Sequence, residues 1–197
     1  FVYAVDQYFA YSRNRTSIRS VAWPAIKQIL DGYRRGTRYN IHMDEGDGLI
    51  AGGTLGTQLT WMDAKIGDWV VTPRSGKPVE IQALWIRALD VGARLAAEFG
   101  ESEYALDCLK NRIRAVESFQ EKFWHKGGMY LYDTIDGPEG DDPSIRPNQV
   151  YAISLCDDLL TKEQAKQVLR TIKDHLLTPV GLRTLSPQDS RYRPRYE

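Results

Sequence analysis

The sequence contains few of the residues that build metal and disulfide sites, with two cysteines and three histidines among 197 residues. Cys108 and Cys156 stand singly, each within a helical pattern, so we expect two buried thiols. His42, His125 and His175 show none of the spacing of metal ligands. The sequence therefore predicts no metal centre.

Excess charge and long apolar runs are also absent. Lys plus Arg (26) balance Asp plus Glu (26), which argues against nucleic acid or an anionic membrane as the main partner. No run of about 18 apolar residues occurs, and the first residues lack the basic start of a signal peptide. We expect a soluble, cytoplasmic protein. Because the chain opens on Phe1 without Met and stops at Glu197, we also expect an excised piece of a longer polypeptide.

Six stretches carry the three- and four-residue apolar spacing of amphipathic helices. They are residues 1–11, 18–35, 78–99, 103–124, 146–155 and 161–176. Pro24 predicts a kink or a late start in the second helix, and Thr161-Lys-Glu-Gln164 is a capping box for the last. The spacing places Leu109, Ile113 and Leu169 on buried helix faces.

The connections between these helices alternate in length. They are short at residues 12–16, at 100–102 and around 160, and long at 37–78, 125–146 and 178–197. Helices joined by short turns pack antiparallel, so we expect the long connections to emerge together on one rim. Short β pieces are expected at 39–42, 49–51 and 127–133, and a loop at 137–143. Asp44-Glu-Gly-Asp-Gly lacks the ligand spacing of an EF-hand, and we interpret it as a tight acidic turn.

The densest cluster of aromatic and charged residues lies in residues 59–85, with two Asp, a Glu, two Lys, an Arg and three Trp. A pyranose ring offers apolar C–H faces that stack on an indole and hydroxyls that bind charged groups. A carboxyl beside an indole loses hydration and holds its proton more tightly, which suits a general acid. The cluster therefore favours a sugar site. The alternative is that Trp61, Trp69 and Trp85 are core anchors beside a solvated loop.

Six ordered blocks of sequence stand out across the chain. They are Thr60-Trp-Met-Asp-Ala-Lys, Gly67-Asp-Trp-Val-Val-Thr-Pro-Arg, Gly76-Lys-Pro-Val-Glu-Ile, Ala83-Leu-Trp, Ser144-Ile-Arg-Pro-Asn-Gln and Leu176-Leu-Thr-Pro-Val-Gly-Leu-Arg-Thr-Leu-Ser-Pro. Together they resemble the C-terminal domain of glycogen debranching enzymes, the amylo-α-1,6-glucosidase. The resemblance implies an all-α fold, an (α/α)6 toroid of helical hairpins with short β pieces in its long loops. Residues 1–197 would form a single domain fragment, about half of that barrel.

The resemblance also implies roles for individual residues. Asp63 matches the family's general acid, which protonates the glycosidic oxygen of an α-1,6-linked glucose. We expect residues of the same rim to bind sugar or to hold Asp63 in place: Trp61, Lys65, Asp68, Trp69, Arg74, Lys77, Glu80, Arg146, Asn148, Gln149 and Arg183. Among them, Asp68 and Trp69 would form the floor of the glucose pocket. Two alternatives stay open: Asp63 as an N-cap or a partner of Lys65, and Arg146 within a helix cap, paired with Asp141 or Asp142.

Hydrolysis with inversion is the chemistry that the resemblance implies, with a second carboxylate about 6.5–9.5 Å from the acid activating water. In the family that base lies beyond the segments matched here, so we expect the chain alone to be inactive. The expected partners are an α-glucan, such as glycogen, limit dextrin or a maltooligosaccharide, and the remainder of the longer polypeptide. No metal or organic cofactor is required. Two rival classes stay open, a non-catalytic glucan-binding segment and a sugar isomerase or epimerase of the α/α toroid type.

Overall fold

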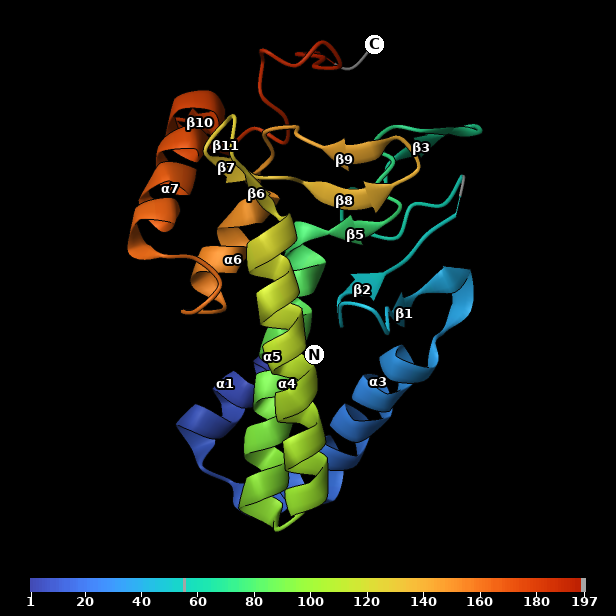
Figure 1. Ribbon diagram of the computed structural model, residues 1–197, viewed down its shortest axis with the longest axis vertical. Coiled ribbons are helices and arrows are strands. Elements are labelled where there is room, and N and C mark those ends of the chain that lie inside the picture. Colours follow the sequence, from blue (N-terminus) through green and yellow to red (C-terminus); the bar gives the residue numbers. More distant parts are fainter. Residues whose placement is uncertain (55, 196–197) are drawn as a thin grey trace.

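A long antiparallel helical hairpin forms the centre of the molecule (Figure 1). The computed structural model describes residues 1–54 and 56–195. The hairpin consists of α4 (Val79–Phe99) and α5 (Ser102–Lys122), each of 21 residues. Gly100 has a φ of 83°, in the left-handed region, and its N–H caps the last carbonyls of α4. Both helices are confirmed within two residues of the bounds that the sequence predicts.

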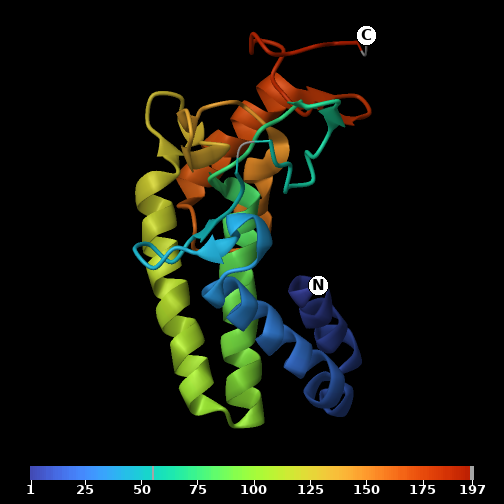
Figure 2. The same ribbon diagram turned by 90° about the vertical axis from the view of Figure 1, so that its right-hand side faces the viewer.

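Three further helices pack on α4, and a fourth, α7, packs on α6 (Figures 1 and 2). They are α1 (Val2–Ser12), α3 (Trp23–Arg35), α6 (Val150–Ser154) and α7 (Lys162–Leu176). The first two lie beside the half of α4 that leads to Gly100, whereas α6 and α7 lie at the opposite end. With 14 of its 21 residues buried, α4 is covered on nearly all sides. Within the described residues, no helix is long and apolar enough to cross a membrane.

Pro24 delays the start of α3, as the sequence predicts. The chain before it forms α2 (Arg15–Ser17) and the π-helical turn η1 (Ile18–Ala22). Proline lacks an N–H and clashes with the carbonyl four residues earlier, which disrupts regular α-helix at this point. The α-helix then begins at Trp23 with Pro24 in its first turn and ends at Gly36.

The described residues include eleven short strands in small antiparallel sheets, most of them at one end of the hairpin (Figure 1). They are β1 (His42–Met43), β2 (Ile50–Ala51), β3 (Lys65–Ile66), β4 (Trp69–Val70), β5 (Lys77–Pro78), β6 (Trp124–His125), β7 (Tyr130–Leu131), β8 (Thr134–Gly137), β9 (Gly140–Asp142), β10 (Leu177–Thr178) and β11 (Gly181–Leu182). Sheet β5–β8–β9 joins the first long connection to the second, and Ser186 N–H donates to the carbonyl of Ile145, which ties in the third. The predicted convergence of the three connections on one rim is confirmed.

Two hairpins were not predicted. Residues 137–143 were expected as a loop, but Gly137 and Gly140 pair across a tight turn between β8 and β9. Strands β3 and β4 pair Ile66 with Trp69, so Gly67-Asp68 is a two-residue turn of the kind that glycine permits at a φ of 57°. The expected β piece at 39–42 is displaced, because Tyr39 and Asn40 adopt positive φ within the 3₁₀ turn η2 (Arg38–Asn40).

The predicted buried faces of α5 and α7 are partly wrong. Leu109 and Ile113 are exposed, as is Leu169 of α7. The side of α5 that faces α4 carries small or flat residues instead: Ala105, Cys108, Ala115 and Phe119. The helices approach closely there, since a Cβ on Gly92 would lie 3.3 Å from the Cys108 sulfur. Apolar residues of α5 lie on more of its circumference than the face that contacts α4. Periodicity alone does not show which of these residues the neighbouring helix covers. The capping box of α7 and the two buried thiols are confirmed.

Lys77 neutralises the acidic turn and ties it to the rim. Asp44 accepts a hydrogen bond from Gly46 N–H, which confirms the tight turn. Lys77 Nζ, nearly buried, binds carboxylate oxygens of Asp44 at 2.8 Å, Asp47 at 2.7 Å and Asp136 at 2.8 Å. The hydrogen bond from Lys77 lowers the pKa of Asp44. Burial works to raise the pKa of Asp47, but hydrogen bonds from the Lys122 and Lys77 ammonium groups outweigh it and lower that pKa.

Replacing this cation should destabilise the fold. We expect Lys77→Met to lower the free energy of unfolding by roughly 3 kcal/mol, at the low end for a broken buried pair, because Lys122 still binds Asp47. The midpoint of urea denaturation measures the loss. Lys166→Met is the control, since the Lys166–Glu163 pair on α7 is mostly exposed and should contribute less than about 1 kcal/mol. Equal losses in the two variants would contradict the structural role of Lys77.

The difference in unfolding free energy between wild type and Lys77→Met should depend on pH. Because the folded pKa values of Asp44 and Asp47 are lowered, their stabilisation is complete above the ordinary Asp pKa of about 3.9. It is lost as the pH falls through the lower folded values. The stability difference between wild type and Lys77→Met should therefore stay constant near neutral pH and shrink below about pH 4. A difference that does not change with acidification would count against these ion pairs.

Candidate functional site

The residues that the sequence singled out separate into an exposed group and a buried group on the rim. Side chains of the loop and hairpin after Thr60 face solvent: Trp61, Asp63, Lys65, Asp68 and Trp69. Side chains around β5 and the start of α6 are buried: Arg74, Lys77, Glu80, Arg146, Asn148 and Gln149. Arg183 is half-buried, and its backbone N–H binds the carbonyl of Leu176. Only the first group can meet a ligand without rearrangement.

Trp61 and Trp69 are 56% and 60% exposed, so the core alternative is wrong for both. It is correct for Trp85, which is buried in α4 and donates to the carbonyl of Gly48. Trp69 follows the two-residue turn that contains Asp68, in the β3–β4 hairpin at the edge of the molecule (Figure 1). These two residues therefore form the end of a projecting hairpin. Within the described residues they line no enclosed pocket, and their role as a pocket floor stays a prediction.

Asp63 lies in an exposed loop between Trp61 and β3. The next element along the chain is a strand, so the N-cap alternative is wrong, and in the described residues Asp63 forms no ion pair with Lys65. The expected desolvation by the adjoining indoles is also absent, because the Asp63 side chain faces solvent. The physical reason is that Trp61 points its indole N–H inward, to the amide oxygen of Asn148 at 2.9 Å, and that Trp69 projects on its own hairpin.

Arg74 is the centre of the buried group. Its guanidinium binds Glu80 Oε2 at 2.6 Å and Asp133 through Nε at 2.7 Å and Nη2 at 3.1 Å. The three side chains are at most 3% exposed. Their donors and acceptors bind one another, so the expectation that Arg74 and Glu80 contact sugar hydroxyls does not fit the structure. Lys77 is likewise enclosed by carboxylates. The other expectation, that these residues hold parts of the site in place, is compatible with the geometry.

Asp133 is the site residue that the sequence did not reveal. Burial raises its pKa, and the positive charge of Arg74 acts against that rise. The buried cluster contains two guanidinium groups, of Arg74 and Arg146, and two carboxylates, of Glu80 and Asp133, so its charges balance. The one available signal was an Asp at the end of the alternating stretch before β8. Its partners could not be inferred, because Arg74 and Asp133 are 59 residues apart.

The polar residues at the start of α6 face inward as well. Arg146 pairs with Asp133 at 3.5 Å and donates to the carbonyl of Thr184, so the expected pairing with Asp141 or Asp142 is wrong. Arg146 directly precedes the 3₁₀ turn η3 (Pro147–Gln149), which contains Asn148 and Gln149. The Gln149 side-chain oxygen accepts a hydrogen bond from Leu131 N–H at 3.2 Å. Asn148 is fully buried. Arg146, Asn148 and Gln149 are thus buried, which does not fit a surface for hydroxyl recognition.

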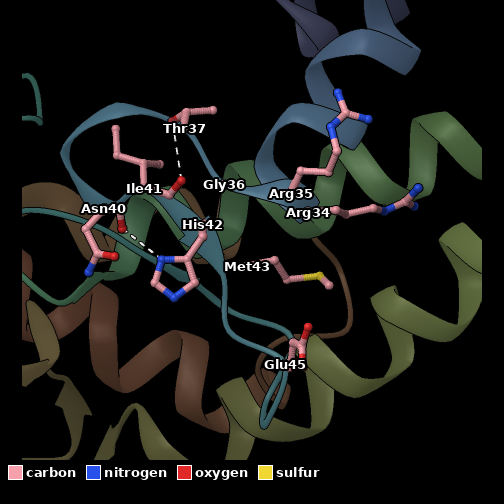
Figure 3. A pocket seen from close by; sticks show the side chains of 9 residues that line it. All are labelled: Arg34, Arg35, Gly36, Thr37, Asn40, Ile41, His42, Met43 and Glu45. Atoms are coloured by element: carbon pink, nitrogen blue, oxygen red, sulfur yellow. Dashed lines mark hydrogen bonds between the residues drawn. The ribbon is translucent and has the colours of Figure 1, made fainter.

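Asp63 lines neither of two cavities found in the described part of the chain. One, of about 420 Å³, is bordered by the end of α3 and by β1 (Figure 3). In that view the guanidinium groups of Arg34 and Arg35 extend away from His42, whose Nδ1 contacts the carbonyl of Asn40 at 2.8 Å. The other, of about 410 Å³, lies on the rim between Pro73, the β8–β9 hairpin and Arg191. The Asp63 side chain is exposed on the surface of the described residues.

Comparison with known proteins adds three findings. The family model described as amylo-alpha-1,6-glucosidase matches residues 1–197. A glycogen debranching enzyme of Saccharomyces cerevisiae is 27% identical over 209 residues, which cover 89% of this chain and 14% of that protein. The crystal structure of a GH78 family rhamnosidase of Bacillus sp. GL1 matches with a TM-score of 0.64 and 20% identity, over 93% of this chain and 17% of the other. The last likeness concerns the fold alone.

The chain thus spans a small part of the length of the proteins that it resembles, while its own length is covered almost completely. The ordered blocks around Asp63 and Asn148 fall inside the region that the family model matches. Since that model covers every residue, the chain belongs to the amylo-alpha-1,6-glucosidase family.

Proposed function

We propose that this chain supplies the acid side of a site that hydrolyses α-1,6-linked glucose at branch points of glycogen or limit dextrin, with inversion. The observation that carries the proposal is the exposure of Trp61 and Trp69 on either side of Asp63 in the sequence. Large apolar faces left in water mark binding surfaces, and an indole matches the C–H face of a pyranose. Membership of the family supplies the class of reaction.

Asp63 is the general acid in this proposal. It donates its proton to the glycosidic oxygen as the bond to the anomeric carbon breaks, and water attacks the opposite face of the ring. A sugar bound against Trp61 displaces water from Asp63, which supplies the desolvation that the free chain lacks. The reaction needs no metal or organic cofactor.

The base that activates water is proposed to lie outside residues 1–197. The buried carboxylates of Glu80 and Asp133 are bound to Arg74 and reach no solvent, so they are unsuited to the task. Without a water activated across the ring, the oxocarbenium-like state has no nucleophile in place. We therefore propose that the 197-residue chain binds maltooligosaccharides and releases no glucose alone.

We further propose that residues 1–197 form about half of an (α/α)6 barrel. The likeness of fold to the rhamnosidase supports a larger structure around these residues, because the chain matches 17% of that structure's length. A second support is an exposed apolar stripe on α5, formed by Leu106, Leu109 and Ile113. Their spacing of three and four residues places them on one face of the helix, where a neighbouring hairpin of the remaining ring would cover them.

The exposure of Asp63 also favours a second candidate, a glucan-binding segment without catalysis. One experiment separates the candidates. The whole protein is incubated with a singly α-1,6-glucosylated maltooligosaccharide, and free glucose is measured together with the anomer that is released before mutarotation. Release of β-glucose supports the inverting glucosidase. Binding without release supports the binding segment, and an isomerised sugar supports the isomerase or epimerase class.

Asp63→Asn should abolish most glucose release. General acid catalysis contributes about 10² to 10⁴ in rate, so we expect the whole protein to lose at least a hundredfold in kcat. The affinity for maltooligosaccharides should change only a few-fold, since Asn keeps the size and hydrogen-bonding capacity of the side chain. Initial-rate assays beside binding isotherms measure both quantities. Near-normal turnover would remove Asp63 from the mechanism.

Trp69→Ala should weaken glucan affinity with little loss of stability, because that indole is more than half exposed. Trp61→Ala should also weaken affinity, and it should cost about 1–3 kcal/mol of stability because it leaves the buried Asn148 amide oxygen without its donor. Binding isotherms and melting curves on the same samples test this. Trp85→Phe is the opposite control, since it removes a buried hydrogen bond to Gly48 and should lower stability with affinity unchanged. If Trp61→Ala and Trp69→Ala bind normally, the indoles are not the sugar platform.

A further inference from the structure

We propose that Asn148 is a positioning residue for the acid loop, the segment Trp61-Met62-Asp63, and that Asp133 orients the Asn148 amide. The inference rests on the proposed roles of Trp61 and Asp63. It assigns a task to two buried residues that reach neither solvent nor sugar. The sequence led us to expect that Asn148 binds sugar hydroxyls. In this proposal Asn148 instead lies beneath the binding surface and supports Trp61.

The amide of Asn148 contacts both residues that precede Asp63. Its oxygen accepts the hydrogen bond from the Trp61 indole at 2.9 Å, and its nitrogen contacts the Met62 sulfur at 3.4 Å. The same nitrogen donates to Asp133 Oδ1 at 2.7 Å. Asn148 is 0% exposed, whereas the Trp61 ring is more than half exposed. A fully buried amide thus holds the polar edge of an indole whose apolar faces remain in solvent.

Asp133 leaves the amide one usable orientation. Arg74 donates to both oxygens of Asp133, so this carboxyl acts as an acceptor, and an indole N–H only donates hydrogen bonds. The amide must therefore turn its nitrogen to Asp133 and its oxygen to Trp61. The reverse orientation would place two donors against each other and two acceptors against each other, with both groups buried and unpaired. The charge of Asp133 determines where Trp61 finds its acceptor.

The scaffold holds Asp133 itself. Arg74 binds both of its oxygens and also binds Glu80 in the first turn of α4. We call the contacts from Trp61 through Asn148 and Asp133 to Arg74 the clamp. The clamp connects the acid loop to the residue before β8 and to α4 through buried side chains. A site that must keep an indole face and a carboxyl in register for a sugar gains from such support, because ordering is completed before the ligand arrives.

The first test measures hydrogen exchange of the Trp61 indole N–H, with no sugar present. With ¹⁵N-labelled tryptophan in the whole protein, the Trp61 indole signal is assigned by its loss in Trp61→Phe, and its exchange with solvent is measured. We expect slow exchange in wild type and exchange at least about tenfold faster in Asn148→Leu. Gln149→Leu is the matched control, since it removes the neighbouring buried amide, which binds Leu131, and should leave the Trp61 signal unchanged. Fast exchange in wild type overturns the clamp.

The second test is a pair of double-mutant cycles on maltooligosaccharide affinity. Asn148→Leu should weaken binding about tenfold in the wild-type background and have little effect once Trp61→Ala is present, because the side chain that it positions is gone. In the Trp69→Ala background it should still cost about tenfold, since Trp69 lies on a separate hairpin. Equal effects of Asn148→Leu in both backgrounds overturn the positioning role.

A swap of the two partners tests the orientation argument. Asn148→Asp alone faces a second carboxylate against Asp133, and we expect fast indole exchange and weak binding. Adding Asp133→Asn restores one amide and one carboxylate between Arg74 and Trp61. The new amide oxygen can accept from one of the two Arg74 nitrogens that bind Asp133, so we expect partial recovery, with exchange and affinity between those of Asn148→Asp and wild type. No recovery in a folded double variant overturns the role of Asp133. If the clamp is intact but Trp61→Ala binds sugar normally, the proposed sugar platform fails instead.

Discussion

The rim of this molecule depends on one guanidinium group. Arg74 lies in the first long connection, binds Glu80 at the start of α4 and binds Asp133 in the second connection. All three charges are buried, and removing Arg74 would leave Glu80 without its ionic partner at a cost of several kcal/mol. The network therefore selects the pairing of β5 with β8 over alternatives that the short strands alone could not distinguish. The first two long connections are thus tied to α4 through buried side chains.

From this cluster the side chains become steadily more accessible toward the candidate site. Asp133 and Asn148 are buried, Met62 lies at the boundary, and Trp61 and Asp63 face solvent. Function is commonly placed in this way, with exposed groups on a loop and the residues that orient them locked in the scaffold. The arrangement also explains an apparent mismatch with the family's chemistry. In the described residues Asp63, Trp61 and Trp69 are exposed. This agrees with the proposal that other parts of a longer protein complete the sugar pocket.

The sequence predicted the features that follow from local rules. Apolar periodicity located the six helices, Pro24 and the Thr161 capping box located two of their starts, and the loop lengths predicted the common rim. The side on which α5 is covered was not predictable, because Leu109 and Ile113 are apolar yet face away from α4. Charged residues were the least predictable. Residue type shows that a buried charge needs a partner, and it does not show that Arg74 finds one 59 residues away.

The central claim is that Asp63 and Trp61 form a sugar-binding acid site held from beneath by Asn148. The most direct measurement is a crystal structure of the whole protein with a bound maltooligosaccharide. We predict a pyranose ring stacked on the Trp61 indole, the Asp63 carboxyl within about 3 Å of a glycosidic oxygen, and Asn148 in contact with Trp61 and Asp133 but not with sugar. A sugar bound elsewhere, or bound directly by the Asn148 amide with Trp61 turned away, would contradict the account.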